Sequence, residues 1–346
     1  MLVLWGVVTV VFLLFNVLPG DPARMMLGQR ADGASIEAIN RDLGRDKPLF
    51  QQYLMYVNDL SPISFHDTDH PDNFLFLHAD KYESFSELIH MGSKVIVFKT
   101  PYLRRSYQTK RRVSEVLMDA LPGTTVLAVT AILFATFFGV ILGIISAVRS
   151  HTLYDNMSLV LSVLGMSLPS FFSGIIIAWL FGYVWSDTTG LNMTGSLYTL
   201  DPFQGEILDL KNLILPALTL GIRPLAIITQ LTRSSLLDVL SQDYIRTASA
   251  KGLSYYKVIT RHALKNAMNP VMTAVSGWFA SLMAGAIFVE IIFGWKGLGK
   301  EIVDSLDKYD FPVVMGCVLV VAVTFVIINM VVDILYGILD PRVRVR

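Results

Sequence analysis

The stretch from Ser241 to Pro270 concentrates the side chains best suited to binding a partner. Asp243 is its only acid, and its basic residues are Arg246, Lys251, Lys257, Arg261 and Lys265. Apolar segments long enough to cross a bilayer lie on both sides of it. A basic segment held at a membrane surface can dock onto another protein or contact lipid headgroups, and composition alone favours the lipid contact.

Gly252 divides this stretch into two short helices that would form the docking surface. The glycine interrupts the helical pattern, and Ser254 is a candidate N-cap for the second helix. Helical spacing places Leu253, Tyr256 and Ile259 on one face of that second helix, with the charged residues on the other. The pattern therefore predicts a pair of helices that is half apolar and half basic.

Two further groups of residues have the composition of chemical sites. The segment from Gly294 to Lys300 has the spacing of a phosphate-binding loop, but Glu301 replaces the Ser or Thr that would hold magnesium, so we predict no ATP site. The other group has the residue types of a zinc site: His66, Asp67, Asp69, His70, Asp72 and His78. We interpret it as an acidic, solvated loop and predict no metal. No nucleophile–base pair is present, so we expect no enzymatic activity and no cofactor.

The composition is that of a membrane protein. The 346 residues are 53% hydrophobic and 16% charged, whereas about a quarter of the residues in a soluble domain are charged. Six apolar segments predict an all-α membrane protein with six transmembrane helices, because intrahelical bonding satisfies the backbone in lipid. These segments are residues 2–18, 124–148, 157–185, 213–236, 270–289 and 311–332. The formal net charge is zero, so we expect no nucleic-acid partner.

The segments divide the chain into four parts. We expect a first transmembrane helix in residues 1–20, an extracytoplasmic region in 21–121, a core with five helices in 122–339, and a tail in 340–346. Positive charges in the loops 149–156 and 237–268 and in the tail place these loops and both termini in the cytoplasm. Basic residues between 104 and 112 fall on the outer side and conflict with this rule, which is weak for loops longer than about 60 residues.

The extracytoplasmic region contains two expected amphipathic helices and a less regular segment. One helix would run from Ser35 to Gly44, and Pro48 would open the second. Residues 61–101 contain two short apolar runs, at 74–77 and 95–98, which could be strands of a small lobe.

Small and charged residues inside the expected spans suggest close packing and a polar path. Gly139 and Gly143 are one turn apart, as are Gly277, Ser281 and Gly285, and such spacing lets helices approach closely within this chain or against a second subunit. The charges at membrane depth are Arg223, Glu290 and Asp333. Arg223 could line a polar cavity and meet a carboxylate of a transported molecule, or form an internal salt bridge.

Several of these residues together resemble a known family. The run from Arg246 to Gly252, followed by His262 to Ala267 and Pro270, looks like the cytoplasmic EAA loop of ABC importer permeases. Its form, Arg-Thr-Ala-x-Ala-Lys-Gly, is typical of the dipeptide/oligopeptide and nickel branch. Other segments resemble the first permease subunit of that branch: Leu18 to Pro22, Asp46 to Leu49, Gly297 to Gly299, and Asp340 to Arg342. The resemblance covers nearly the whole chain.

Two features depart from the family pattern. Lys296 stands where the family usually has a proline, which puts the conformation of that loop in question. Residues 61–101 have no counterpart in typical members, so we interpret them as a large insertion between the first and second helices. We expect this insertion to contact a binding protein outside the membrane, and neither to hold a metal nor to enter the membrane.

The resemblance implies a type I ABC importer in a bacterial inner membrane, with di- or oligopeptides as substrates. Its partners would be a second permease subunit in a heterodimer, two cytoplasmic ABC ATPases, an extracytoplasmic substrate-binding protein and membrane lipids. Arg223 and Glu290 are candidates for the translocation path. The residues implied to couple to the ATPases are Arg246, Thr247, Ala248, Ala250, Lys251, Gly252, Leu253, Tyr256 and Arg261.

Three alternatives remain open. The same architecture could import nickel complexes or oligosaccharides. A different class is an envelope assembly factor that acts through residues 61–101. A membrane enzyme is disfavoured, because the chain lacks a catalytic constellation.

Overall fold

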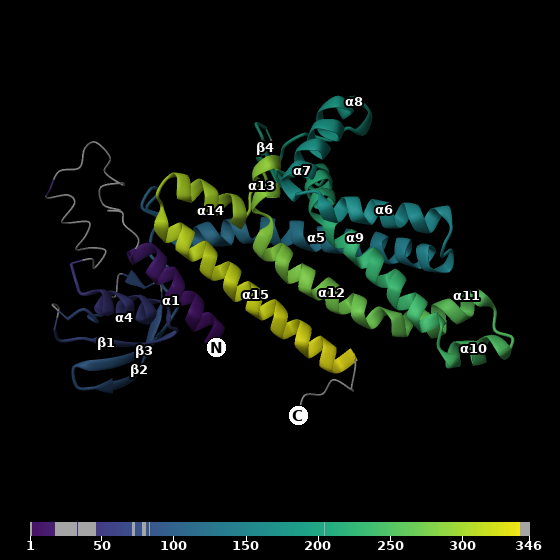
Figure 1. The fold of residues 1–346 in the computed structure, drawn as a ribbon. Helices are drawn as coiled ribbons and strands as arrows, with labels where there is room; N and C mark the ends of the chain where they lie inside the picture. Colours follow the sequence, from purple (N-terminus) through teal and green to yellow (C-terminus); the bar gives the residue numbers. More distant parts are fainter. Residues whose placement is uncertain are drawn as a thin grey trace. The chain divides into compact units, whose positions relative to one another are not determined.

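The apolar segments fold as helices, and the computed structural model describes residues 2–17, 33, 46–70, 73–77, 81–82, 84–203 and 205–339. The chain divides into two compact units, Met1–Asp119 with Glu301–Val323, and Ala120–Lys300 with Thr324–Arg346. Helices α5 (Val113–Val148), α14 (Leu298–Asp307) and α15 (Phe311–Leu339), labelled in Figure 1, each belong in part to both units.

The first unit pairs the apolar helix α1 (Leu2–Val17) with α4 (Leu49–Leu60). The ring of Phe12 packs against those of Tyr53 and Tyr56, at centroid distances of 5.2 and 5.6 Å. The predicted helix after Pro48 is confirmed, and it begins where the fixed φ of proline suits a helix start. The helix predicted from Ser35 to Gly44 lies outside the described residues.

The segment 61–101, which we call the sheet lobe, contains a three-stranded antiparallel sheet in the order β1–β3–β2. The strands are β1 (Ile63–Asp67), β2 (Phe85–Met91) and β3 (Lys94–Lys99). The expected strand at residues 95–98 is confirmed as part of β3. The run at 74–77 is a turn in which Phe76 forms a single bridge to Asp67, so the expectation of a strand there is wrong.

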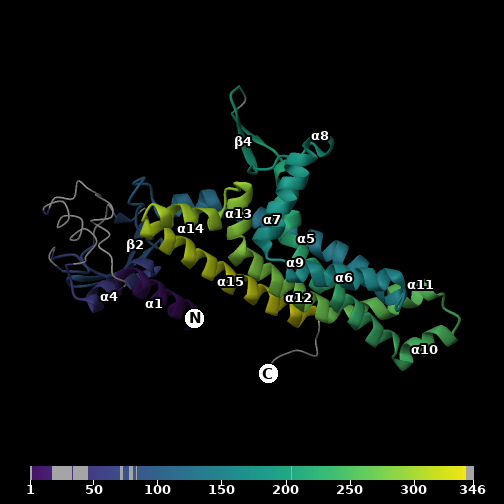
Figure 2. The same cartoon turned by 45° about the horizontal axis from the view of Figure 1, so that its top comes forward.

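The second unit holds the remaining helices and a small hairpin. Figure 2 shows the hairpin of β4 and β5 projecting from the helices of this unit, and no sequence pattern had predicted it. Helices α9 and α12 lie side by side in Figures 1 and 2. The elements are α6 (Leu153–Ser167), α7 (Ser170–Trp179), η3 (Leu180–Val184), α8 (Ser186–Thr189), β4 (Tyr198–Asp201), β5 (Gly205–Leu208), α9 (Lys211–Leu240), α12 (Leu264–Gly285) and α13 (Ile287–Phe293).

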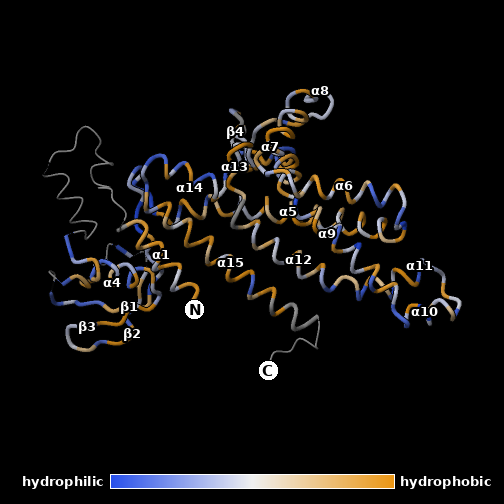
Figure 3. The backbone as a smooth tube through the Cα atoms, viewed as in Figure 1, coloured by the Kyte–Doolittle hydropathy of each residue, from blue (hydrophilic) through white to orange (hydrophobic). Residues whose placement is uncertain are grey.

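The described part of the chain holds 3 helices that are long and apolar enough to cross a membrane, or up to 5 if each bent pair is one span. The three are α5, α9 and α15, and Figure 3 shows α15 as hydrophobic along most of its length. The apolar segment 157–185 is not one straight helix, because the chain bends by 107° between α6 and α7. Pro169 lies at this bend, where its missing N–H interrupts helical bonding. The chain is therefore mainly helical and apolar, while α1, with 16 residues, is shorter than the expected first span.

Close packing of α5 against α9 depends on two glycines. A Cβ at Gly139 would lie 2.9 Å from the Ile228 Cγ2 atom, and one at Gly143 would lie 2.5 Å from the Thr232 Cβ atom. The expected small-residue packing is therefore present within this chain at Gly139 and Gly143. At Gly277 no atom lies within 4 Å of such a Cβ, so this glycine serves no close contact among the described residues.

Candidate functional site

The basic stretch forms two short helical pieces, as its sequence predicts. Helix α10 (Asp243–Ala250) is followed by a turn, by α11 (Tyr255–Lys257) and by the π-helix η4 (Val258–Ala263). Gly252 lies in the turn with φ +79, and no atom lies within 4 Å of a Cβ built on it. The left-handed backbone, and not crowding within this chain, therefore requires glycine here. We call residues 243–263 the coupling segment.

The buried side of the coupling segment, which we call its underside, is apolar and packs against other helices of the same chain. Ala248 is 8% exposed and packs in a cluster of mostly small residues. This cluster consists of Ala147, Leu236, Ile245, Ala248, Val258, Ala263 and Ala267. Ala248 was expected among the residues that contact an ATPase. In this chain it is buried in that cluster, and its contact with an ATPase stays a prediction.

The opposite side of the coupling segment is exposed. Tyr256 is 76% exposed and Leu253 is 37% exposed. Arg246 forms an exposed ion pair with Asp243, at 3.5 Å between Nη1 and Oδ1. The other expected coupling residues on this exposed side are Thr247, Ala250, Lys251, Gly252 and Arg261. The structure therefore brings all but Ala248 to the accessible surface.

Two details of the second helical piece differ from the prediction. Ile259 is 7% exposed and lies on the buried side, away from the exposed Tyr256. Ile259 is the second residue of the π-helix η4, in which Val258 and Ala263 are buried with it. Ser254 occupies the N-cap position of α11, but its side chain makes no capping hydrogen bond.

Glu290 is a fully buried residue of α13, and the glycine-rich loop that follows this helix closes around it. Its Oε1 accepts a hydrogen bond from the Thr124 hydroxyl at 2.7 Å, and its Oε2 accepts one from the Lys300 N–H at 2.9 Å. A Cβ at Gly297 would lie 2.5 Å from the Glu290 carboxyl group, so the loop can close around the carboxylate only with glycine there. The segment that resembles a phosphate-binding loop does enclose a carboxyl group, but this group belongs to the chain itself. Glu290 is thus engaged within its own chain, and its place in a translocation path stays a prediction.

The loop also has an ordered conformation at Lys296, where the family usually has proline. The Lys296 N–H donates to the Ser196 hydroxyl at 3.1 Å. The neighbouring Trp295 is fully buried, and its indole N–H donates to the Gly123 carbonyl at 3.0 Å. These bonds fix the loop without the ring of a proline.

Arg223 stands alone as an exposed residue in the middle of α9. Its neighbours Gly221, Pro224 and Ala226 are buried. Within the described ranges its guanidinium group forms no ion pair, so the internal salt bridge considered from the sequence is not formed. Asp333, the third expected charge at membrane depth, falls in α15, and its side chain lies outside the described residues.

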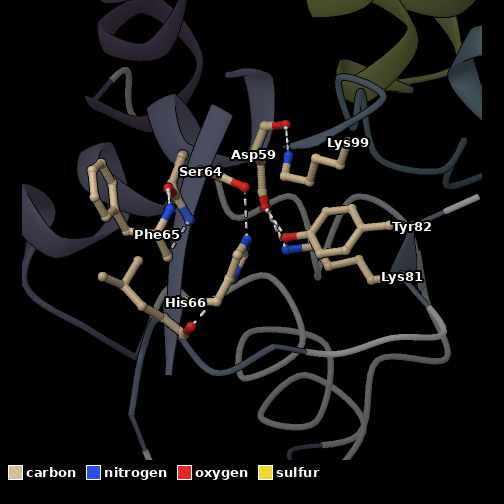
Figure 4. A network of polar contacts seen from close by, with 9 residues as sticks. Asp59, Ser64, Phe65, His66, Lys81, Tyr82 and Lys99 are labelled. Carbon is tan, nitrogen blue, oxygen red and sulfur yellow. Dashed lines mark hydrogen bonds and ion pairs between the residues drawn. The ribbon is translucent and has the colours of Figure 1, made fainter. Parts of the chain in front are cut away.

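The sheet lobe contains a buried polar network that the sequence did not predict (Figure 4). The two carboxylate oxygens of Asp59 accept hydrogen bonds from Lys81 Nζ, each at 2.8 Å, and Oδ1 also accepts one from the Tyr82 hydroxyl at 3.0 Å. Lys99 Nζ donates to the Asp59 carbonyl at 2.6 Å and lies 4.5 Å from the Tyr82 ring centroid. Burial lowers the pKa of Lys99 to about 8, against the opposing effect of Asp59. The network joins the end of α4 to the sheet.

His66 belongs to this buried interior. Its Nε2 is 2.9 Å from the Ser64 hydroxyl. Burial and the positive charge of Lys99 lower the pKa of His66 to about 4. Among the described residues no group of three or more His, Cys, Asp or Glu side chains could hold a metal ion, and Asp72 and His78 lie outside them.

A second buried ion pair was also missed, near the base of the coupling segment. Arg233 Nε lies 2.6 Å from Asp155 Oδ1, and the Asp155 side chain is 2% exposed. The sequence held a signal, because Arg233 falls inside the apolar segment 213–236 and needs a partner there.

Comparisons with known proteins identify the family. The family described as "Binding-protein-dependent transport system inner membrane component" matches residues 139–345, and the corresponding N-terminal family matches residues 1–70. The chain belongs to this family. The permease is thus an inner membrane component of a binding-protein-dependent transport system, as its EAA-like segment suggested.

Relatives of the permease include peptide transport proteins. It is 36% identical to the di/tripeptide transport system permease protein DppB of Pseudomonas aeruginosa (strain UCBPP-PA14), across 98% of this chain and 94% of that protein. It is 34% identical to the glutathione transport system permease protein GsiC of Salmonella paratyphi A, across 98% of this chain and 94% of that protein. A chain of the MetNI methionine ABC transporter in inward-facing conformations shares the fold, with a TM-score of 0.53 at 14% identity, over 66% of this chain and 97% of that one.

Proposed function

We propose that this permease forms part of the translocation path for di- or oligopeptides and that cytoplasmic ABC ATPases dock on its coupling segment. The observation that carries the proposal is the two-sided construction of residues 243–263. Their small apolar side chains are buried against the permease, whereas basic and aromatic side chains such as Lys251 and Tyr256 are exposed. A solvated loop that only contacts lipid would not need this fixed underside.

The coupling segment is connected to its neighbouring helices by short links that can transmit a displacement. Only Ser241 and Gln242 separate α9 from α10, and η4 continues directly into α12. A displacement of the short helices therefore acts on α9 and α12, which pack side by side. Closure of two ATPases around ATP would in this way rock the membrane helices between inward-open and outward-open states.

The path itself would be formed with a second, similar permease subunit, and an extracytoplasmic binding protein would deliver the peptide. Arg223 is exposed on α9 of the isolated chain, and a guanidinium group suits the carboxylate that every peptide carries. Helix α12 exposes Asn269, Thr273 and Gly277 at helical spacing. A polar and small-residue face of this kind suits a water-filled path or a second subunit better than lipid.

Substitutions at Gly252 test the docking role. Gly252→Val opposes the left-handed backbone, because a β-branched residue rarely adopts positive φ, whereas Gly252→Asn tolerates it. We expect Gly252→Val to insert normally but to lose about tenfold in peptide uptake, a barrier change of about 1.4 kcal/mol. Gly252→Asn should stay much closer to wild type.

The measurements are ATPase co-purification and peptide uptake by the reconstituted transporter. No atom of the described residues lies within 4 Å of a new Cβ at position 252. A loss in both variants would therefore indicate collision with a docked partner. Normal uptake and normal stimulation of hydrolysis in Gly252→Val would refute the docking role.

A further inference from the structure

One carboxylate outside the coupling segment holds four segments of the second unit together. Asp155, in the first turn of α6, is 1% exposed. Its Oδ1 accepts hydrogen bonds from the Ser146 hydroxyl of α5 and from Arg233 Nε of α9. Its Oδ2 accepts bonds from the His151 backbone N–H and from Arg233 Nη2, both at 2.9 Å. A single side chain therefore joins α5, the turn after it, α6 and α9.

This ion pair lies next to the apolar underside of the coupling segment. Ala147 follows Ser146 directly, and Leu236 lies about one turn beyond Arg233. Both Ala147 and Leu236 are buried in the cluster that supports α10. The polar contacts of Asp155 and the apolar contacts of the coupling segment thus belong to one continuous packed region.

The geometry indicates a positioning role more than a contribution to stability. A buried ion pair adds little net stability, because desolvation of both charges offsets their attraction. A bidentate Arg–carboxylate contact does, however, fix the distance and the angle between the segments that carry it. His151 donates its N–H to Asp155 from a left-handed conformation, with φ +62, so the turn also adopts a specific shape.

We propose that Asp155 and Arg233 are a positioning pair that makes the α5–α6 turn move with the coupling segment. This inference rests on the proposed docking of ATPases. When the ATPases displace α10, the pair would carry the displacement through α9 to α5 and α6. Without it, α9 could shift alone, and ATP hydrolysis would continue with less movement of the other helices.

Three variants of the assembled transporter test the pair in proteoliposomes. Asp155→Asn removes one charge at nearly constant volume, Arg233→Lys keeps the charge but loses the bidentate contact, and the double variant Asp155→Asn/Arg233→Gln leaves no unpaired charge. We expect ATPase co-purification and basal hydrolysis to persist. The ratio of peptide transported to ATP hydrolysed should fall about fivefold or more, the lower end of typical coupling effects.

A matched control is available in the exposed pair of Arg111 and Asp119, whose Nη2 and Oδ2 atoms are 2.8 Å apart. Asp119→Asn should leave the transport ratio at the wild-type value. If the Asp155→Asn transporter fails to assemble, the transport ratio of the double variant tests the proposal, because the double variant buries no unpaired charge. A ratio within twofold of wild type in any assembled variant that lacks the bidentate contact overturns the proposal. Co-purification measures ATPase docking, whereas the ratio of peptide transported to ATP hydrolysed measures the effect of the Asp155–Arg233 pair. Failure of the docking proposal can therefore be distinguished from failure of the positioning proposal.

Discussion

The sheet lobe and the coupling segment are both polar stretches between apolar helices, yet they are built in opposite ways. In the sheet lobe the polar groups of the central network face inward: His66 is 4% exposed and Lys99 is 2% exposed, while Phe65 on the other face of β1 is 60% exposed. In the coupling segment the polar groups face outward, over a buried layer of small apolar residues.

This difference separates residues that maintain a fold from residues that are available to a partner. The buried charges of this network, Asp59 and Lys99, are engaged within the lobe and at the end of α4, so they cannot serve as a docking surface without unfolding it. The charges of the coupling segment have few partners in this chain. If the sheet lobe contacts a binding protein, as its position between the first two apolar segments suggests, its exposed apolar face is better suited to the contact than its acids and bases.

The largest expected effect comes from removing the centre of the lobe network. Asp59→Ala leaves Lys81 and the Tyr82 hydroxyl without their acceptor and should destabilise the lobe by about 3 kcal/mol. Faster hydrogen exchange of the β3 amides in the purified transporter would show this, with ATPase co-purification unchanged. Asp69→Ala is the matched control, because Asp69 is an exposed carboxylate of the same lobe. Equal exchange in both variants would contradict the assigned role of the network.

A smaller effect should follow from pH. The pKa of His66 is lowered from its ordinary value of 6.5 to about 4 in the folded lobe. Between pH 6.5 and pH 4 the unfolded lobe therefore binds the proton more tightly than the folded lobe does. The lobe should therefore lose stability as pH falls from 6.5 towards 4, by at most about 1.4 kcal/mol per pH unit. Hydrogen exchange of β1, corrected for the intrinsic rate, measures this. The dependence should weaken in His66→Gln, and an unchanged slope there would assign it to another group.

The smallest effect is expected in the coupling segment, at the residue that looked like a helix cap. A Ser that caps a helix contributes about 1 kcal/mol, but Ser254 makes no capping hydrogen bond. Ser254→Ala should therefore change the free energy of unfolding, and the activation free energy of peptide uptake, by less than about 0.5 kcal/mol. Thermal unfolding of the purified permease measures the first quantity. A full capping loss would show that the serine bonds to the backbone after all.

Local signals in the sequence predicted local structure well. Gly252, Pro48 and the pair of Gly139 and Gly143 each act through the backbone or through immediate contact, so their roles follow from residue type and spacing. The family resemblance located the coupling segment for the same reason, since its motif is contiguous.

Features that depend on tertiary context were missed or misjudged. The 107° bend at Pro169 divides an apolar segment that reads as one span. Ile259, at the start of the π-helix η4, is buried although its spacing placed it with the exposed Tyr256. Glu290 is enclosed by a loop and by Thr124, which lies 166 positions earlier in the chain. In each case the environment of the residue depends on a partner far away in the sequence or on a departure from a regular α-helix. A periodic pattern of apolar residues reveals neither.

The most direct test of the central claim is a photo-crosslink from the exposed face of the coupling segment. Benzoylphenylalanine at position 256 replaces Tyr256, which is 76% exposed, and the same group at position 198 replaces Tyr198, which is 50% exposed in β4. In membranes that contain the complete transporter, we expect position 256 to crosslink to an ATPase subunit and position 198 not to. Crosslinks from position 256 to lipid alone would contradict the account and assign this segment to the membrane surface.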